Sequence, residues 1–149
     1  NDNEPNQVVL SGHKIAIEKA CVKAKSFGAK RAILLPVSAP FHCSLMSAAQ
    51  KNMISVISEL NIKKPIVPLI SNITSIPTQK IEEIRKNLIN QITGRVRWRE
   101  SISFMENSGI QKVYEIGPGR VLCNLIRRIS DTLEQENISK VEDLFKLGN

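Results

Sequence analysis

The sequence predicts an α/β protein, because apolar segments typical of buried strands alternate along it with segments that carry one apolar helical face. The first such unit is a strand over residues 7–12 (QVVLSG), a helix over 13–27 and a strand over 30–37. In the helix, alanines recur at every fourth residue, and Gly28 supplies the signal at which it should end. This order favours a layered arrangement of sheet and helices.

The same alternation continues after residue 38. The expected elements are a helix over 42–60, a strand over 66–73, a helix over 81–92, a helix over 101–107, a strand over 112–117 and a helix over 121–133. Pro68 lies inside one of these strands, which favours a sheet edge because proline cannot donate a hydrogen bond. The tail after Asp131 is polar and weakly patterned.

The composition bounds the class of protein. The 149 residues, of which 42% are hydrophobic, can bury the core of one domain. No run of 18 apolar residues exists and no signal peptide is visible, so no membrane partner is expected. Without an initiator methionine, the chain looks like a piece of something longer. Three cysteines without a CxxC pair suit reduced thiols in the cytoplasm, and two histidines argue against a zinc site, so neither metal nor cofactor is expected.

Two motifs each admit two interpretations. RVRWRE (95–100) places the only tryptophan between arginines in a chain of net charge +7, which is one pattern of nucleic-acid binding. Aromatic residues total only 4%, so we favour a solvated helix face beside one core aromatic and expect no nucleic-acid partner. EIGPGRVL (115–122) resembles half of a phosphate-binding loop, but a tight turn is favoured, in which Gly117 and Gly119 permit unusual dihedral angles.

His42 is the candidate catalytic residue. It follows a predicted strand and begins a predicted helix, and sites in α/β sheets gather beyond the carboxyl ends of the strands. An imidazole there is suited to general acid/base catalysis near neutral pH. Cys43 is adjacent, but neighbouring helical residues point about 100° apart, and no G-x-S-x-G elbow occurs. The sequence therefore offers a general base without its nucleophile.

Four stretches resemble one known family in their order and spacing. They are QVVLSGHKIAIEKA (7–20), AKRAILLPVSAPFHCSLM (29–46), NLINQITGRVRW (87–98) and VYEIGPGRVLCNLIRRI (113–129), and they are similar to the C-terminal half of bacterial malonyl-CoA:acyl carrier protein transacylases. The resemblance extends to about Asp131. It implies a longer complete protein, whose missing N-terminal half would hold a nucleophilic serine in a GHSxGE elbow and an arginine for the malonyl carboxylate.

The resemblance also implies roles for five residues. PFHCSLM is similar to the family's catalytic-histidine motif, so His42 becomes the general acid/base. Gln91 matches the start of a Q-x-x-x-x-V-x-W stretch, in which a main-chain carbonyl holds the other imidazole nitrogen. Phe41 accompanies malonyl selection in related domains, and Asn3 and Asn72 match stretches close to the active site, so these three are candidates for substrate binding.

The implied fold is the second half of a ferredoxin-like small subdomain over residues 1–37, followed by the C-terminal part of a hydrolase-like α/β acyltransferase subdomain over 38–149. The implied reaction, in fatty acid biosynthesis, transfers malonyl through a seryl ester. Its partners would be malonyl-CoA, acyl carrier protein and the missing N-terminal half of the same enzyme. Four basic residues are candidates for contacting the acidic carrier protein: Lys23, Lys25, Lys30 and Arg31.

Three hypotheses follow, from different classes. In the first, the chain supplies the histidine half of an [acyl-carrier-protein] S-malonyltransferase and is inactive alone, because it lacks the serine. In the second, it is a basic module that binds nucleic acid. In the third, it is a non-catalytic scaffold with the acyltransferase fold. Titration against salt separates the first two, because binding through phosphate contacts weakens steeply as salt rises.

Overall fold

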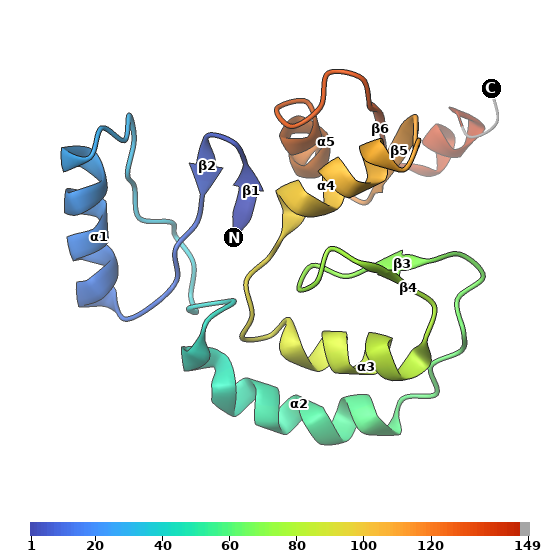
Figure 1. Cartoon of the computed structure of the whole chain (residues 1–149), viewed down its shortest axis with the longest axis horizontal. Coiled ribbons are helices and arrows are strands. Elements are labelled where there is room, and N and C mark those ends of the chain that lie inside the picture. Colours follow the sequence, from blue (N-terminus) through green and yellow to red (C-terminus); the bar gives the residue numbers. More distant parts are fainter. Residues whose placement is uncertain (147–149) are drawn as a thin grey trace.

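The computed structural model describes residues 1–146 of the chain. Its helices are α1 (Lys14–Ser26), α2 (Ser47–Glu59), α3 (Ile81–Asn90), α4 (Trp98–Asn107) and α5 (Val121–Ile126), with 3₁₀ turns at Ser44–Met46 and Val141–Lys146. Its strands are β1 (Asp2–Glu4), β2 (Gln7–Val8), β3 (Leu69–Ile70), β4 (Pro77–Thr78), β5 (Lys112–Ile116) and β6 (Glu134–Ile138). The predicted mixture of helices and strands is confirmed, and the described strands pair two by two (Figure 1).

Residues 98–138 hold the main hydrophobic core. β5 and β6 pair in parallel, from Lys112 opposite Glu134 to Ile116 opposite Ile138, and α5 lies in the connection between them. Such a crossover is what parallel strands require. The core consists of three buried residues and four partly buried neighbours: Ile102, Ile126 and Leu133, with Trp98, Met105, Val113 and Ile129 packed around them.

β1 is bound to the segments beside α4 and α5 through buried carboxylates. Asp2 and Glu4 are only 6% and 3% exposed. Asp2 pairs with Arg95 at 2.6 Å and with Arg99 at 2.8 Å, and Glu4 pairs with Arg128 at 3.3 Å. Burial alone would raise the pKa of Asp2, but the hydrogen bonds and charges of Arg99 and Arg95 outweigh it and hold that pKa below its ordinary value. The first strand is therefore held by residues far along the chain.

α2 and α3 pack against each other below the β3–β4 pair (Figure 1). The guanidinium of Arg85 on α3 donates to the carbonyl oxygens of Ile57 and Leu60, where α2 ends. Thr78 in β4 donates its hydroxyl to Glu83 in the first turn of α3, at 2.5 Å. The bonds of Arg85 use carbonyl groups that the end of α2 leaves unpaired and join α3 to α2, whereas the bond between Thr78 and the Glu83 carboxylate joins β4 to α3.

The predicted strand over residues 30–37 is wrong. None of the described strands pairs with this segment, and the amide of Val37 donates instead to the carbonyl of Leu35, at 2.9 Å. Ile33 and Leu34 are 62% and 57% exposed. An apolar run becomes a β-strand only when a neighbouring strand completes its backbone hydrogen bonds.

Several element boundaries also differ from the prediction. The helix expected over 42–60 begins at Ser47 after a 3₁₀ turn, the helix expected over 121–133 ends at Ile126, and the strand expected over 66–73 is reduced to β3. β6 was not expected, because its sequence EQENI is polar. It forms because it pairs with β5 along its whole length, with Glu136 3.0 Å from Lys112.

Within residues 1–146, the structure shows neither a helix that could cross a membrane nor a cluster that could bind a metal ion. No helix in this range has the length and apolar character needed to cross a bilayer. No cluster of three histidine, cysteine or acidic side chains in this range could hold a metal ion.

Candidate active site around His42

His42 lies in a tight turn between the exposed apolar segment of residues 30–37 and the 3₁₀ turn that precedes α2. Its φ angle is +62°, in the left-handed region that residues with side chains seldom adopt. The turn is held on both sides of the histidine. Cys43 donates its thiol to the carbonyl of Pro40 at 3.1 Å, and the amide of Met46 donates to the carbonyl of Cys43 at 3.0 Å. Such backbone strain persists only where the surrounding structure enforces it, and it occurs often at functional sites.

The imidazole of His42 is hydrogen-bonded to the main chain of Gln91. Nδ1 lies 2.9 Å from the carbonyl oxygen of Gln91, across 49 positions of sequence. A carbonyl oxygen only accepts, so Nδ1 must carry the proton. The neutral ring then has its lone pair on Nε2, the tautomer that can accept a proton from a nucleophile. The structure brings together the two residues that the family resemblance implied as partners, through the main-chain atom that it implied.

The carbonyl of Gln91 stands at the start of a loop over residues 91–97, which joins α3 to α4. Gly94 fits this loop tightly: a Cβ atom there would lie 2.0 Å from Cδ1 of Ile73 and 2.9 Å from the carbonyl oxygen of Asn90. Further along, the amide of Arg97 donates to the carbonyl of Asn72, at 2.7 Å. Close packing and backbone hydrogen bonds therefore position a loop that has no regular structure of its own.

Gln50 is a supporting residue that the sequence analysis missed. Its side-chain amide Nε2, on α2, donates to the carbonyl oxygen of Ile89 in the last turn of α3, at 3.0 Å. This bond joins the helix after His42 to the helix before Gln91, so it helps to set the distance between them. A polar residue on the apolar face of the predicted helix was the signal that could have identified it.

The three candidates for substrate binding have different surroundings. Phe41 is 48% exposed and adjoins His42. Asn72 contacts the loop through its main-chain carbonyl, which accepts from Arg97. Asn3 lies in β1, where its side-chain amide donates to Gln7 at 3.5 Å. Among the hydrogen bonds of residues 1–146, none joins the side chain of Asn3 or Asn72 to His42, so their roles stay predictions.

The arginines around Trp98 are paired within the protein. Arg97 is 2.8 Å from Glu100, and Arg95 and Arg99 both contact Asp2. Trp98 itself packs against the core. Ion pairs with carboxylates compete with phosphate contacts, and the partly buried indole of Trp98 has less surface free for stacking on bases. This arrangement counts against the nucleic-acid hypothesis.

The glycine-rich stretch forms a turn, as favoured from the sequence. Gly117 and Gly119 have φ angles of +138° and +88°. The carboxylate of Glu115 accepts the backbone amides of Leu122 and Cys123, at 3.0 and 2.9 Å, at the start of α5. Burial alone would raise the pKa of Glu115, but the two amides, the Cys123 side chain and the charge of Arg120 together outweigh it and lower that pKa. The position that a phosphate would take in a phosphate-binding loop is thus filled by the protein's own carboxylate.

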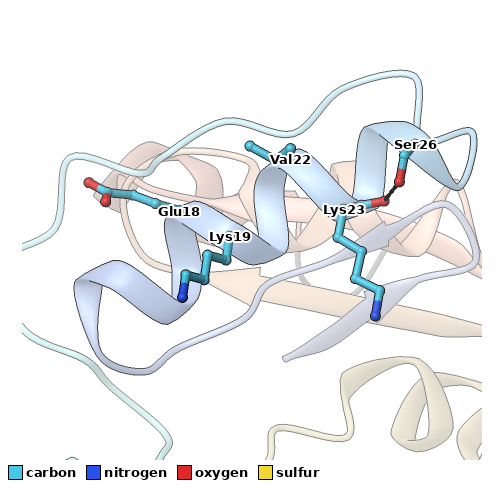
Figure 2. A pocket seen from close by; sticks show the side chains of 5 residues that line it. All are labelled: Glu18, Lys19, Val22, Lys23 and Ser26. Carbon is cyan, nitrogen blue, oxygen red and sulfur yellow. Dashed lines mark hydrogen bonds between the residues drawn. The ribbon is translucent and has the colours of Figure 1, made fainter.

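The four basic candidates, Lys23, Lys25, Lys30 and Arg31, are all exposed. Lys23 also lines a shallow hollow along α1 with Glu18, Lys19, Val22 and Ser26, and its carbonyl accepts the hydroxyl of Ser26 at 2.8 Å (Figure 2). The lysine side chains extend away from the helix there. None of the residues that line this hollow belongs to the site around His42.

No family model matches the chain. The malonyl CoA-acyl carrier protein transacylase of Escherichia coli K12 is 41% identical over 133 residues, which are 89% of this chain and 43% of that protein. The enzyme of the same name from Synechocystis sp. is 36% identical over 147 residues, which are 99% of this chain and 49% of that protein.

Solved structures agree with these relatives. A malonyl-transacylase in complex with its type II PKS acyl-carrier protein matches with a TM-score of 0.91 at 38% identity, over 97% of this chain and 47% of that chain. The crystal structure of the Synechocystis transacylase matches with a TM-score of 0.90 at 35% identity, over 99% and 49%. The chain is therefore a homologue of the malonyl-CoA:acyl carrier protein transacylases that spans about half the length of the relatives it matches.

Proposed function

We propose that this chain carries the general acid/base histidine of a malonyl-CoA:acyl carrier protein transacylase, and that the remainder of the enzyme supplies the nucleophile. The observation that carries the proposal is the hydrogen bond from Nδ1 of His42 to the carbonyl oxygen of Gln91, 2.9 Å long. It holds the ring in the tautomer that leaves Nε2 free to accept a proton. The left-handed backbone of His42 supports the same assignment, because a packing role alone would not require it.

In the proposed reaction, His42 moves protons in both halves of the transfer. Nε2 takes the proton of the serine hydroxyl as its oxygen attacks the thioester carbon of malonyl-CoA, and then gives that proton to the departing CoA sulfur. In the second half, Nε2 takes the proton of the phosphopantetheine thiol, whose sulfur attacks the seryl ester. The serine oxygen leaves and recovers the proton from His42. Gln91 acts through its main-chain carbonyl, which stabilises the imidazolium formed in each half.

The neighbouring residues have proposed roles in the same site. Phe41, exposed beside His42, contributes to selection of the malonyl group. Asn3 and Asn72 would border the substrate, because both lie beside the loop of residues 91–97. Asn72 accepts the amide of Arg97 through its main-chain carbonyl, and Asn3 follows Asp2, whose amide donates to the carbonyl of Val96. Residues 1–37 would complete a ferredoxin-like subdomain, and residues 38–149 would belong to the hydrolase-like acyltransferase subdomain.

The charge of the chain suits the proposed partners. Acyl carrier proteins are acidic and CoA carries phosphates, whereas this chain has a net charge of +7. Lys23, Lys25, Lys30 and Arg31 are exposed and available for such contacts. We place the enzyme in fatty acid biosynthesis in the cytoplasm, with no membrane and no nucleic acid among its partners.

The first test uses the 149-residue chain alone with radiolabelled malonyl-CoA and carrier protein. We expect no transfer, because the seryl ester requires an activated hydroxyl and no nucleophile elbow occurs in this sequence. Turnover by a preparation of confirmed mass would contradict the proposal, and Cys43 would then have to be considered as the nucleophile.

The second test places the chain in a complete enzyme. The matching 147 residues of the Synechocystis transacylase are replaced by this chain, and malonyl transfer is measured for the chimera and two variants. His42→Ala should lower the rate by about 10²–10⁴-fold, the usual contribution of a positioned general base. Gln91→Ala is the matched control, because it keeps the main-chain carbonyl, and its effect should be far milder. Equal losses in both variants, with the fold preserved, would contradict the role assigned to the Gln91 carbonyl.

A further inference from the structure

The loop of residues 91–97 determines where the carbonyl that binds His42 stands, and contacts from outside the loop hold it. On one side, the main-chain carbonyl of Asn72 accepts the amide of Arg97, at 2.7 Å. On the other side lies β1. Without such contacts, a loop between two helices would take several conformations. The hydrogen bond from His42 to the carbonyl of Gln91 would then form in only a fraction of the molecules.

β1 binds this loop through Asp2. The amide of Asp2 donates to the carbonyl oxygen of Val96, at 2.9 Å. Its carboxylate oxygen Oδ2 accepts from Nη2 of Arg95 at 2.6 Å and from Nη2 of Arg99 at 2.8 Å. The side chain of Asp2 is only 7% exposed, whereas the side chains of Arg95 and Arg99 are 52% and 42% exposed, so these charge-assisted bonds are shielded from solvent on the side of Asp2 alone. One buried residue thus binds the chain before, at and after Val96.

The geometry points to Asp2 as a positioning residue for His42: by holding residues 95–99 against β1, it keeps the carbonyl of Gln91 where the imidazole needs it. This inference rests on the proposed function, in which the Gln91 carbonyl fixes the tautomer of His42. Asp2 forms no hydrogen bond or ion pair with His42, so it acts only through the loop.

Glu4 supplies a matched comparison within the same strand. It is 3% exposed, as deeply buried as Asp2, and it pairs with Arg128 at 3.3 Å. Its other carboxylate oxygen accepts the amide of Asn6, at 2.7 Å. Neither bond reaches the loop of residues 91–97. Replacing Glu4 therefore removes a buried charge from β1 while leaving the proposed route to His42 intact.

The test reads the tautomer of His42 directly and does not depend on enzymatic activity. The chain contains only two histidines, so ¹⁵N-histidine labelling gives few signals, and His13→Gln assigns them. At a pH where the ring is neutral, the ¹⁵N shifts distinguish the protonated ring nitrogen from the unprotonated one. Wild-type chain should show His42 with the proton on Nδ1. Asp2→Asn, which is nearly isosteric, should shift His42 toward a mixture of tautomers and accelerate exchange of its Nδ1 proton roughly tenfold, the equilibrium value of one hydrogen bond.

Glu4→Gln should keep the wild-type signals of His42. The inference is overturned if Asp2→Asn leaves the tautomer and exchange rate of His42 unchanged, or if Glu4→Gln alters them equally. Should Asp2→Asn fail to fold, Arg95→Gln provides a milder variant, because Asp2 stays paired with Arg99. It should change the His42 signals in the same direction and by less, and no change would equally overturn the inference.

The chimeric transacylase adds a kinetic readout. Asp2→Asn should lower kcat roughly ten- to a hundredfold while KM for malonyl-CoA stays near its wild-type value, because the defect concerns the orientation of a proton-transferring group. If transfer proves independent of His42, the proposed function fails, yet the NMR comparison still decides whether Asp2 positions the imidazole. A positive NMR result with normal kinetics would show that positioning by Asp2 has no catalytic role and would overturn that part of the inference.

Discussion

Gly94→Ala is the substitution whose effect the structure specifies most directly. The added Cβ atom would lie 2.0 Å from Cδ1 of Ile73, 3.3 Å from Cγ1 of the same residue and 2.9 Å from the carbonyl oxygen of Asn90. The first contact involves the end of a flexible side chain, which can rotate away. The carbonyl oxygen of Asn90, in contrast, belongs to the backbone of the last turn of α3, and it can move away only if that turn moves. Gly94 is three residues from Gln91, so that movement displaces the carbonyl that binds His42.

Two opposing contributions determine how much Gly94→Ala changes the free energy of unfolding. Gly94 does not have a positive φ angle, so alanine is tolerated by the backbone and reduces the entropy of the unfolded chain, which stabilises by about 0.4–1 kcal/mol. Overpacking of a tight contact costs about 1–3 kcal/mol. The second term is larger, and we expect the free energy of unfolding to fall by about 1–2 kcal/mol.

Chemical denaturation of the chain measures this change, and Ile73→Val supplies the test of its cause. Valine lacks Cδ1, so the double variant Gly94→Ala/Ile73→Val removes the shortest contact. The two substitutions should be non-additive, with a coupling of about 1 kcal/mol that restores part of the lost stability. The remaining loss reflects the contact with Asn90, which Ile73→Val does not relieve.

Two results would refute this reasoning. The first is a Gly94→Ala variant as stable as the wild type, which would mean that the loop yields at no cost. The second is strict additivity with Ile73→Val, which would mean that the two side chains do not compete for the same space. In the chimeric enzyme, Gly94→Ala should also lower the rate of malonyl transfer by more than Ile73→Val alone does.

Further predictions concern the turn before α5, the thiols and the exposed apolar segment. Glu115→Gln should lower the free energy of unfolding by about 1–2 kcal/mol at pH 7, because the carboxylate accepts two backbone amides. The folded-state pKa of Glu115 is depressed, so this contribution to stability is present above the ordinary carboxyl pKa of about 4.3 and is lost as the pH falls below that pKa. If Glu115→Gln has equal effects in denaturation series at pH 7 and pH 3, this prediction is contradicted. Cys123 is fully buried, and burial raises the pKa of its thiol, so a thiol reagent should modify Cys21 and Cys43 first and Cys123 only as the chain unfolds. Residues 30–37 should make the isolated chain bind a hydrophobic dye, and Leu34→Ser should reduce that binding without loss of α1 helicity.

The elements with strong helical periodicity were predictable from the sequence, and those that depend on a distant partner were not. α1 was predicted to within one residue at each end, because alanine spacing and Gly28 define it locally. β6 was missed because nothing in EQENI indicates a buried strand, and its pairing with β5 comes from tertiary structure. The segment over 30–37 shows the converse, since its composition is that of a strand and the described residues supply no strand to pair with it.

The residues of the candidate site also differ in how well the sequence could predict them. His42 could be singled out from its place between a strand-like run and a helix, but its partner could not be found by such reasoning. Gln91 binds it through a main-chain carbonyl, which every residue possesses, so no side-chain pattern marks the position. Only the resemblance to a family identified it. Asp2 had no sequence signal at all, and Gln50 was marked only as a polar residue on an apolar helix face, because the contacts of both residues join segments far apart in the chain.

The central claim is that His42 transfers protons in malonyl transfer, and chemical rescue tests it most directly. His42→Ala in the chimeric transacylase removes the imidazole and leaves space in the turn for a small molecule. Single-turnover malonyl transfer by this variant should be slower by about 10²–10⁴-fold, and added imidazole should restore part of the rate in a concentration-dependent manner. Gln91→Ala should show no such rescue, because its imidazole is still in place. A His42→Ala variant that transfers malonyl at the wild-type rate without imidazole would contradict the account.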